Sequence, residues 1–561
     1  MVDRPLRILG GSLHSARIHR PSWRFQLAKS LCIAAMTLCL ASPPTSAQTL
    51  NGTVSFIPVT TSAYGADSIN SSAITLNNLV TIGAYQFITY YNNSDDIMIG
   101  RRATGSSTWT FDNTTYTANQ ITDGHDMIAI AVDSNGQMHM SWGMHNNTLN
   151  YVISSNSVLG TTFAPTFVTQ TSTNNPTLFS QLSSVNQVTY PTFYYAPDGN
   201  LIFSYRDAAA ATGGGSGNGN TLLAAFNPTA TASPSTPDSK FSTVELWNGG
   251  QTSVNAYPNS MAFDSSGNLL ASWTWRASPD WRTNENIMYA QSPNDGTTWY
   301  QQGGSTQYTL PIISSTSNGG SAQQVGQAIE NLPQGSELIN QTSMAVSTTG
   351  LPVIATWWAP GWTPTSSTAG SGNPNRQYMV VYYNGSAWKT SQISNRTSDT
   401  LTNTIDDSSG ADVGDMGRPV VLIDKQNRVL VIMRDEDNGV NVAGAYSSGN
   451  SGNNLTLAYS TNLFTSSTPT WTHVTLDTAN MGDYEPSFDL KLWESSNILD
   501  LFYEPNSFDG QTAGDVQILQ WNESAYFDSL PEPGPALLLS IGAALMLMRP
   551  RRLSVRPAPL V

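Results

Sequence analysis

A short sequence unit recurs through the middle of this 561-residue chain. Each copy contains an apolar strand, a polar turn that is typically Asp-x-x-Gly, and a second strand that often ends in an aromatic residue. The copies are AIAVDSNGQMHMSW (129–142), YYAPDGNLIFSY (194–205), MAFDSSGNLLASW (261–273), MAVSTTGLPVIATW (344–357) and, more loosely, VVLIDKQNRVLVIM (420–433). Alternating apolar and polar residues around such turns predict β-hairpins, so the chain is expected to be all-β.

The spacing of the copies predicts how the hairpins are arranged. We take the turn residues as Asp133, Asp198, Asp264, Thr348 and Asp424, roughly 65 to 85 residues apart, which leaves room for a four-stranded sheet in each period. Weaker units at 79–91 and 486–504 bring the total to seven. The coils of a β-helix are far shorter, so we predict a seven-bladed β-propeller over residues 75–528, after a lead-in at 48–74. SPNDGTTW (292–299) resembles the Asp-box turn of sialidase-like propellers and supports this prediction.

Both ends of the chain are predicted to lie outside the propeller. Residues 1–47 have a basic start, an apolar stretch and a small-residue cleavage site ending at Ala47, as in a signal peptide. Residues 529–561 contain Pro-Glu-Pro, an apolar run and then arginines, and they resemble the PEP-CTERM sorting tail; a simple membrane anchor is the alternative. We therefore expect an exported protein of a Gram-negative bacterium, extracellular or on the cell surface, with transient membrane contact through the tail.

Charge and cysteine content argue against nucleic-acid binding, disulfides and thiolate metal sites. The chain has 24 Lys and Arg against 39 Asp and Glu, and its net charge of −15 argues against nucleic acid. Both cysteines, Cys32 and Cys39, lie in the predicted signal peptide, so the mature chain has no disulfide and no thiolate metal site. We expect a monomer.

Three of the few histidines fall within one short segment. Aligning the units on their turns places His139 in an apolar slot, so we expect it to be a packed structural residue. The same alignment gives His125 and Tyr190 equivalent places on neighbouring blades, and it places His145 and Arg206 just after equivalent strands. Because equivalent places of a propeller converge around its axis, these four side chains are expected to meet. The histidine spacing matches no compact zinc motif, and separate surface positions are the alternative.

Such a set suits β-elimination from a uronic acid. This reaction removes the proton next to a carboxylate and expels the oxygen on the following carbon. Arg can neutralise the carboxylate with its planar guanidinium, a second His can assist, and His and Tyr are suited to proton transfer. An anionic polysaccharide approaching an acidic protein would also need the local positive charge of these residues.

The segment DGHDMIAIAVDSNGQMHMSWGMHNN, followed by TYPTF and SYRD, resembles the BNR-repeat-containing family that includes ulvan lyases, and is most similar to polysaccharide lyase family 25. The resemblance implies a seven-bladed propeller that cleaves ulvan, a sulfated rhamnose–uronate polymer. It also implies that His125 and Tyr190 transfer protons, and that His145 and Arg206 neutralise the carboxylate. Related lyases carry a structural zinc that this chain lacks the cysteines to bind. We therefore expect no required cofactor, with a Ca²⁺ in Asp and Asn loops left open.

Further residues are candidates for sugar subsites. In WTWRASPDWR, sugar rings could stack on Trp275 and Trp281, and Arg276 and Arg282 could pair with sulfate; core packing is the alternative. Two other functions stay open from the sequence alone. A sialidase-like glycoside hydrolase would need an arginine cluster and a Tyr–Glu pair, and a non-catalytic carbohydrate-binding propeller at the cell surface would need no proton-transfer pair.

Overall fold

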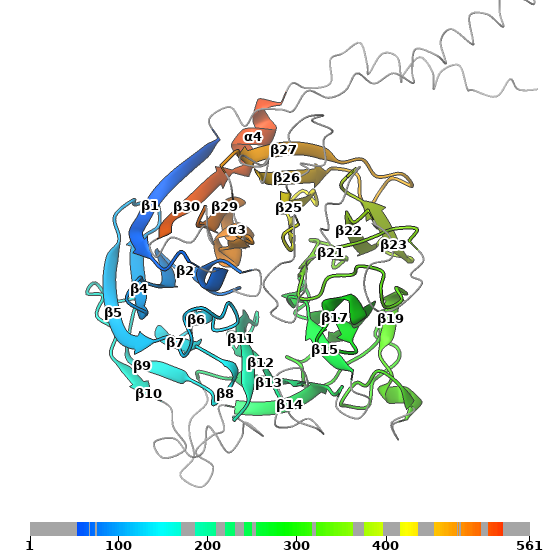
Figure 1. Cartoon of the computed structure of the whole chain (residues 1–561), viewed down its shortest axis with the longest axis horizontal. Helices are drawn as coiled ribbons and strands as arrows, with labels where there is room; N and C mark the ends of the chain where they lie inside the picture. The colour runs from blue at the N-terminus through cyan, green and yellow to red at the C-terminus, as the bar shows by residue number, and fades with distance from the viewer. Residues whose placement is uncertain are drawn as a thin grey trace, which may run out of the picture. The chain divides into compact units, whose positions relative to one another are not determined.

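The structure is a computed structural model. It describes residues 53–66, 68–72, 76–169, 186–208, 219–229, 241–249, 254–316, 321–362, 375–396, 416–435, 454–479, 481, 484–505 and 514–530. The predicted signal peptide and the tail from residue 531 onward lie outside these residues. The described residues form seven antiparallel sheets arranged in a ring, which confirms the predicted seven-bladed β-propeller (Figure 1).

The first three blades follow in chain order. Blade 1 contains β2 (Leu79–Ile82), β3 (Tyr85–Tyr91), β4 (Asp96–Ala103) and β5 (Thr110–Thr117). Blade 2 contains β6 (Ile128–Val132), β7 (Gln137–Trp142), β9 (Tyr151–Ser157) and β10 (Phe167–Thr169). Blade 3 contains β11 (Val188–Tyr195), β12 (Leu201–Asp207), β13 (Asn220–Phe226) and β14 (Phe241–Trp247), and the short β8 (His145–Asn147) pairs with its inner strand β11.

Four blades complete the ring. Blade 4 contains β15 (Asn255–Pro258), β16 (Ala262–Phe263), β17 (Leu269–Arg276), β18 (Asn284–Ser292) and β19 (Gln327–Glu330). Blade 5 contains β20 (Ser343–Val346), β21 (Pro352–Trp358), β22 (Gln377–Tyr383) and β23 (Trp388–Gln392). Blade 6 contains β24 (Val420–Ile423), β25 (Val429–Asp435), β26 (Asn454–Ser460) and β27 (Thr472–Asp477). Blade 7 contains β28 (Ser487–Phe488), β29 (Ile498–Tyr503), β30 (Gly514–Asn522) and, as its outer strand, β1 (Val54–Ala63).

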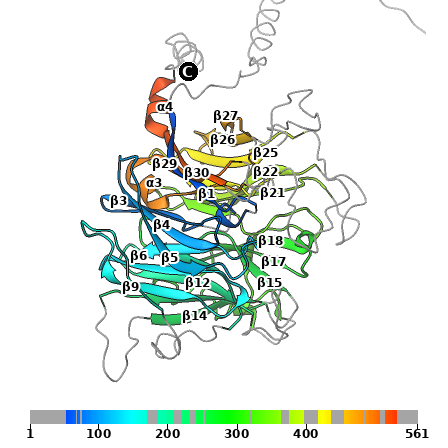
Figure 2. The same ribbon diagram turned by 60° about the vertical axis from the view of Figure 1, so that its left-hand side comes forward.

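Helices are few and short. The described 3₁₀ turns are η1 (Ser68–Asn70), η2 (Trp281–Thr283) and η4 (Ala322–Gln324). The described α-helices are α3 (Leu490–Ser496), which lines the apolar central cavity together with the inner strands, and α4 (Glu523–Ser529), which lies beside β1 in both views (Figures 1 and 2). Within the described ranges, no helix has the length and apolar character needed to span a membrane.

The ring is closed by the N-terminal strand. Strand β1 pairs along β30, with Phe56 opposite Leu519 and Ile57 opposite Ile518. Blade 7 is therefore built from both ends of the chain, and the pairing of β1 with β30 closes the ring. This corrects the predicted lead-in at 48–74, because residues 54–63 are part of the propeller.

The repeated turns form as expected, but two of them begin earlier than the alignment placed them. In blade 2, Asp133 N donates to Gln137 O and Asp133 O accepts from Gly136 N, both at 2.9 Å. The residue making the same backbone bonds is Ala196 in blade 3 and Ser347 in blade 5, rather than Asp198 and Thr348. The side chains of these turns differ although the backbone geometry is the same, so the sequence alignment was shifted in both blades.

The core lies between neighbouring blades, where apolar faces meet. His139 is fully buried, and its Nδ1 lies 2.6 Å from the hydroxyl of Tyr151, which confirms its predicted structural role. The Asp-box turn is also present: the indole Nε1 of the fully buried Trp299 donates to Gly296 O at 2.7 Å. These buried aromatics hold blades 2 to 4 together and so fix the ends of their strands.

Candidate active site

The predicted site residues lie where the inner strands begin and the second strands end, at the end of blades 2 and 3 away from the repeated hairpin turns. His125 belongs to the loop between β5 and β6, and His145 begins β8. Because His145 pairs with Thr189 of β11, the loop of blade 2 is attached to the inner strand of blade 3. Tyr190 follows in β11, and Arg206 lies near the end of β12.

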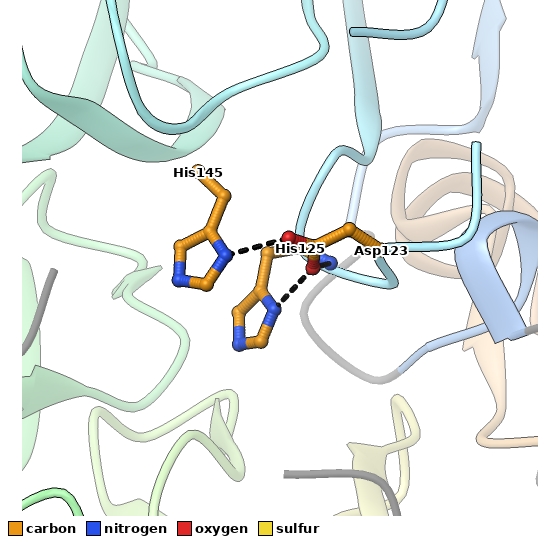
Figure 3. Close-up of side chains that lie close together, drawn as sticks. All are labelled: Asp123, His125 and His145. Atoms are coloured by element: carbon orange, nitrogen blue, oxygen red, sulfur yellow. Dashed lines mark hydrogen bonds and ion pairs between the residues drawn. The ribbon is translucent and has the colours of Figure 1, made fainter. Parts of the chain in front are cut away.

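The two histidines share one carboxylate (Figure 3). His125 Nδ1 lies 2.6 Å from Asp123 Oδ1, and His145 Nδ1 lies 2.7 Å from Asp123 Oδ2. The two rings are stacked, with centroids 4.0 Å apart and planes 18° apart. The convergence of His125 and His145 was predicted, but the role of Asp123 was not. An Asp two residues before a His in a turn looks like an ordinary turn residue, and only the structure shows the second histidine on its other oxygen.

The charges in this group affect one another. Burial alone would raise the pKa of Asp123, but the hydrogen bonds with His125 and His145 outweigh it and hold that pKa well below its usual range. Burial lowers the pKa of His125, and the positive charges of His145 and Arg206 add to the effect, against the opposing influence of Asp123. Burial and the neighbouring positive charges therefore favour the neutral form of His125.

Tyr190 reaches this group through an irregularity in its strand. Its φ is +61°, and the pairing of β11 with β12 shifts register between Thr189 and Thr192. Such a bulge re-aims a side chain, and here the Tyr190 ring lies 5.8 Å from the His125 ring. Because the turn of blade 3 begins at Ala196, Tyr190 and His125 are not equivalent positions of their blades. The side chains meet as predicted, but for a different reason.

Arg206 packs against two tyrosines. Its guanidinium carbon lies 4.7 Å from the ring centroid of Tyr190 and 4.9 Å from that of Tyr257 in β15. Arg276 lies on Tyr257 as well, at 5.0 Å. Burial alone would raise the pKa of Tyr257, but Arg206 and Arg276 outweigh it and lower that pKa below its usual value of 10.0. Burial raises the pKa of Tyr190.

Tyr257 was not predicted, although the sequence contained a signal for it. Tyr190 and Tyr257 are both the third residue of an inner strand, and both are followed by proline. Tyr190 and Arg206 also line a small cavity near the axis, together with Asn259, Gln341 and Thr342 of the next two blades. Polar groups of blades 3, 4 and 5 thus face one space.

The candidate subsite residues separate into two kinds. Arg276 lies beside the site, where its Nε donates to Ser278 O at 2.9 Å, and Arg282 pairs with Asp280 at 2.9 Å. Trp275 and Trp281 are only 2% and 3% exposed and pack edge-on against Trp273 and Trp357. Their ring faces are covered by the core, which corrects the expectation that they stack on sugars.

Asp123, His125 and His145 are also the one group in the described ranges with three metal-ligand atoms close together, within 4.8 Å of one another. Their geometry does not favour a metal. Both Nδ1 atoms are taken by Asp123, and the stacked rings direct their Nε2 atoms side by side rather than toward a common point (Figure 3). The expectation that no cofactor is required stays a prediction.

Comparisons with known proteins support the propeller fold. The sequence model of a BNR repeat-containing family matches residues 85–396, more than half of the chain. No curated protein sequence matches. Two solved structures share the fold. One is described as a polysaccharide lyase PL25 ulvan lyase (11% identity, TM-score 0.53, 85% of this chain and all of that one), and the other as polysaccharide lyase Uly1 (13%, 0.57, 83% and 99%).

Proposed function

The chain belongs to the BNR repeat-containing family, and on that premise we propose that it is a polysaccharide lyase that cleaves a uronic-acid-containing, ulvan-like polymer by β-elimination. The observation that carries the proposal is the meeting of two histidines, two tyrosines and a buried arginine at one end of the propeller. Core packing does not require such a set, and each member has a role in the elimination.

The first requirement is neutralisation of the substrate carboxylate, because a carbanion next to an ionised carboxylate is too unstable to form. Arg206 carries a permanent charge and a planar guanidinium that matches a carboxylate. His145, held at Nδ1 by Asp123, would direct its Nε2 toward the same group. Positive groups already in place cost little reorganisation when charge develops on the substrate.

The second requirement is a pair of proton-transfer groups. The base removes the proton from C5 of the uronate, the electron pair forms the C4–C5 double bond, and the C4–O bond breaks as the leaving oxygen takes a proton from the acid. Neutral His125 and the Tyr190 phenol lie near enough to serve the same sugar ring. Which of the two is the base depends on the epimer of the uronate. Tyr257, whose pKa is lowered by Arg206 and Arg276, is a third group able to take part.

The substrate class is also part of the proposal. A solved PL25 ulvan lyase with the same fold (10% identity, TM-score 0.52, 85% of this chain and all of that one) is described as bound to -[GlcA(1-4)Rha3S]-. A uronate next to a sulfated sugar would suit Arg206 at the reacting unit and Arg276 beside it. We further propose that the protein is an exported monomer, with residues 1–47 removed and residues 529–561 making transient contact with the membrane.

Incubation with ulvan tests the proposal. Elimination leaves an unsaturated uronate that absorbs in the ultraviolet, whereas hydrolysis gives only new reducing ends. We expect absorbance to rise with the unaltered protein and not with His125→Ala or Tyr190→Phe. His473→Ala and Tyr300→Phe are matched controls in blades 6 and 4 that should keep the rate. New reducing ends without absorbance would contradict the proposal.

A further inference from the structure

The Asp123 carboxylate is placed to control both histidines at once. Its Oδ1 accepts from the backbone N–H of His125 at 3.0 Å and from the His125 ring at 2.6 Å, while its Oδ2 accepts from the His145 ring at 2.7 Å. The side chain of Asp123 is only 19% exposed. Since an ionised carboxylate has no hydrogen to donate, the proton in each of the two ring contacts must lie on the histidine Nδ1.

The consequence for the rings follows from imidazole chemistry. A neutral imidazole carries one N–H, so a ring that donates from Nδ1 has a bare Nε2 with a free electron pair. Both rings then present a bare Nε2, and Figure 3 shows these two nitrogens on the side of the rings away from Asp123. An Nε2 atom that is bare can take a proton from a substrate or, once protonated, donate to it.

The loop that carries Asp123 is itself fixed. Asp123 N donates to Gln120 O at 3.0 Å, and Asp126 N donates to Asp123 O at 2.9 Å. The buried Asp126 carboxylate accepts from Gln120 N at 2.7 Å, and the Asp126 carbonyl accepts from the Tyr91 hydroxyl of blade 1 at 2.7 Å. Asp123 is therefore anchored to the wall of blade 1.

His145 is fixed from the other side. Its backbone N–H donates to Asn147 Oδ1 at 3.0 Å, and the next residue, Asn146, donates from its backbone to Thr189 Oγ1 of blade 3 at 3.0 Å. Asp123 thus links a residue anchored on blade 1 to a residue anchored on blade 3, and the two stacked rings lie across this link.

We propose that Asp123 is a positioning residue that fixes both His125 and His145 in the tautomer with the proton on Nδ1, so that both Nε2 atoms face the substrate. The catalytic role of these two Nε2 atoms rests on the proposed function. In this role Asp123 acts through the two rings that it contacts. Losing such an orienting carboxylate typically lowers activity by about 10- to 100-fold, and in serine proteases by more.

The tautomers can be read directly. With ¹⁵N-labelled histidine, two-bond proton–nitrogen correlation spectra of the full chain distinguish a ring carrying its proton on Nδ1 from one carrying it on Nε2. His125→Gln and His145→Gln assign the signals. At a pH where both rings are neutral, we expect both in the Nδ1–H form. Finding either ring in the Nε2–H form would overturn the proposal whether or not the protein degrades a polysaccharide.

The matched variants are Asp123→Asn and Asp198→Asn. The amide at position 123 keeps one acceptor and gains a donor, so one ring should switch to the Nε2–H form, and turnover should fall about 100-fold with KM little changed. Asp198 is exposed in the hairpin turn at the other end of β11, and its variant should keep both the spectrum and the rate. Wild-type tautomers and rate in Asp123→Asn would overturn the proposal.

Two further outcomes are distinguishable. A purified protein that contains one equivalent of zinc, and whose histidine signals change on chelation, would make the cluster a metal centre and overturn the positioning role. If instead the tautomers are as expected and change in Asp123→Asn, but ulvan and other uronate polymers give no unsaturated product, the positioning of the rings stands and the proposed reaction fails.

Discussion

The side chain of Arg206 occupies the space that a side chain at Gly219 would need. The substitution Gly219→Ala should therefore displace Arg206 without removing any functional group. Gly219 directly precedes β13, and a Cβ atom built there would lie 2.2 Å from Arg206 Cγ, 2.5 Å from Cδ and 2.9 Å from Nε. Carbon atoms prefer separations of about 3.5–4.0 Å, so Gly219→Ala must move the Arg206 side chain by about 1 Å or more.

The expected effect follows from that displacement. A misplacement of about 1 Å in a catalytic group costs about 100-fold in rate, which corresponds to about 2.7 kcal/mol of transition-state stabilisation. Overpacking of this kind costs about 1–3 kcal/mol of folding stability, which a large propeller tolerates. We therefore expect Gly219→Ala to fold, to melt slightly earlier and to lose about 100-fold in kcat/KM on ulvan.

The assay is the initial rate of ultraviolet absorbance at several ulvan concentrations, with thermal unfolding measured in parallel. Gly160→Ala is the matched control, because the nearest heavy atom to its Cβ would be Ser157 O at 4.0 Å. Full activity in a folded Gly219→Ala protein would refute the reasoning, since it would mean that the position of Arg206 does not matter to turnover.

The pH dependence of turnover, the closure of the ring and the packing of the core can each be tested. The pKa of His125 is lowered from 6.5, so activity that needs its neutral form should persist below pH 6.5 and fall only as pH drops through the lowered pKa; a rate that declines above 6.5 on acidification would contradict this. A chain that begins after residue 63 lacks β1 and exposes β30 as an edge, so it should aggregate or lose cooperative unfolding, whereas a chain that begins at residue 53 should not. Trp299→Ala removes a fully buried indole and should cost about 3–5 kcal/mol in denaturant unfolding without changing the reaction; a loss below about 1 kcal/mol would contradict the packing described.

The fold was largely predictable because the repeated turn is a local feature. Asp133, Asp264 and Asp424 each accept from backbone amides of their own turns, and such turns are visible in sequence. Ala196 and Ser347 begin the same turn without an Asp side chain, so the sequence alignment misplaced the start of the turn in blades 3 and 5. Strand β1 contains no turn of this kind, and its pairing with β30 depends on residues at the other end of the chain.

The meeting of the four site residues was predicted, but the spacing argument that made Tyr190 equivalent to His125 was wrong, because the turn of blade 3 begins at Ala196. His125, His145, Tyr190 and Arg206 do meet. Two sets of contacts were not predicted. The Asp123 carboxylate bonds to the rings of both His125 and His145, and Tyr257 lies against the guanidinium groups of Arg206 and Arg276. No local sequence pattern reveals either set, because each depends on how the chain folds. Trp275 and Trp281 were assigned to sugar because exposed tryptophans suit that role, whereas here both are buried between blades.

The most direct test of the central claim is the ultraviolet spectrum of the products when residues 48–530 act on ulvan, recorded beside the His125→Ala variant. We expect the absorbance of an unsaturated uronate with the unaltered protein and none above background with the variant. New reducing ends without that absorbance, or equal absorbance from both proteins, would contradict elimination at this site.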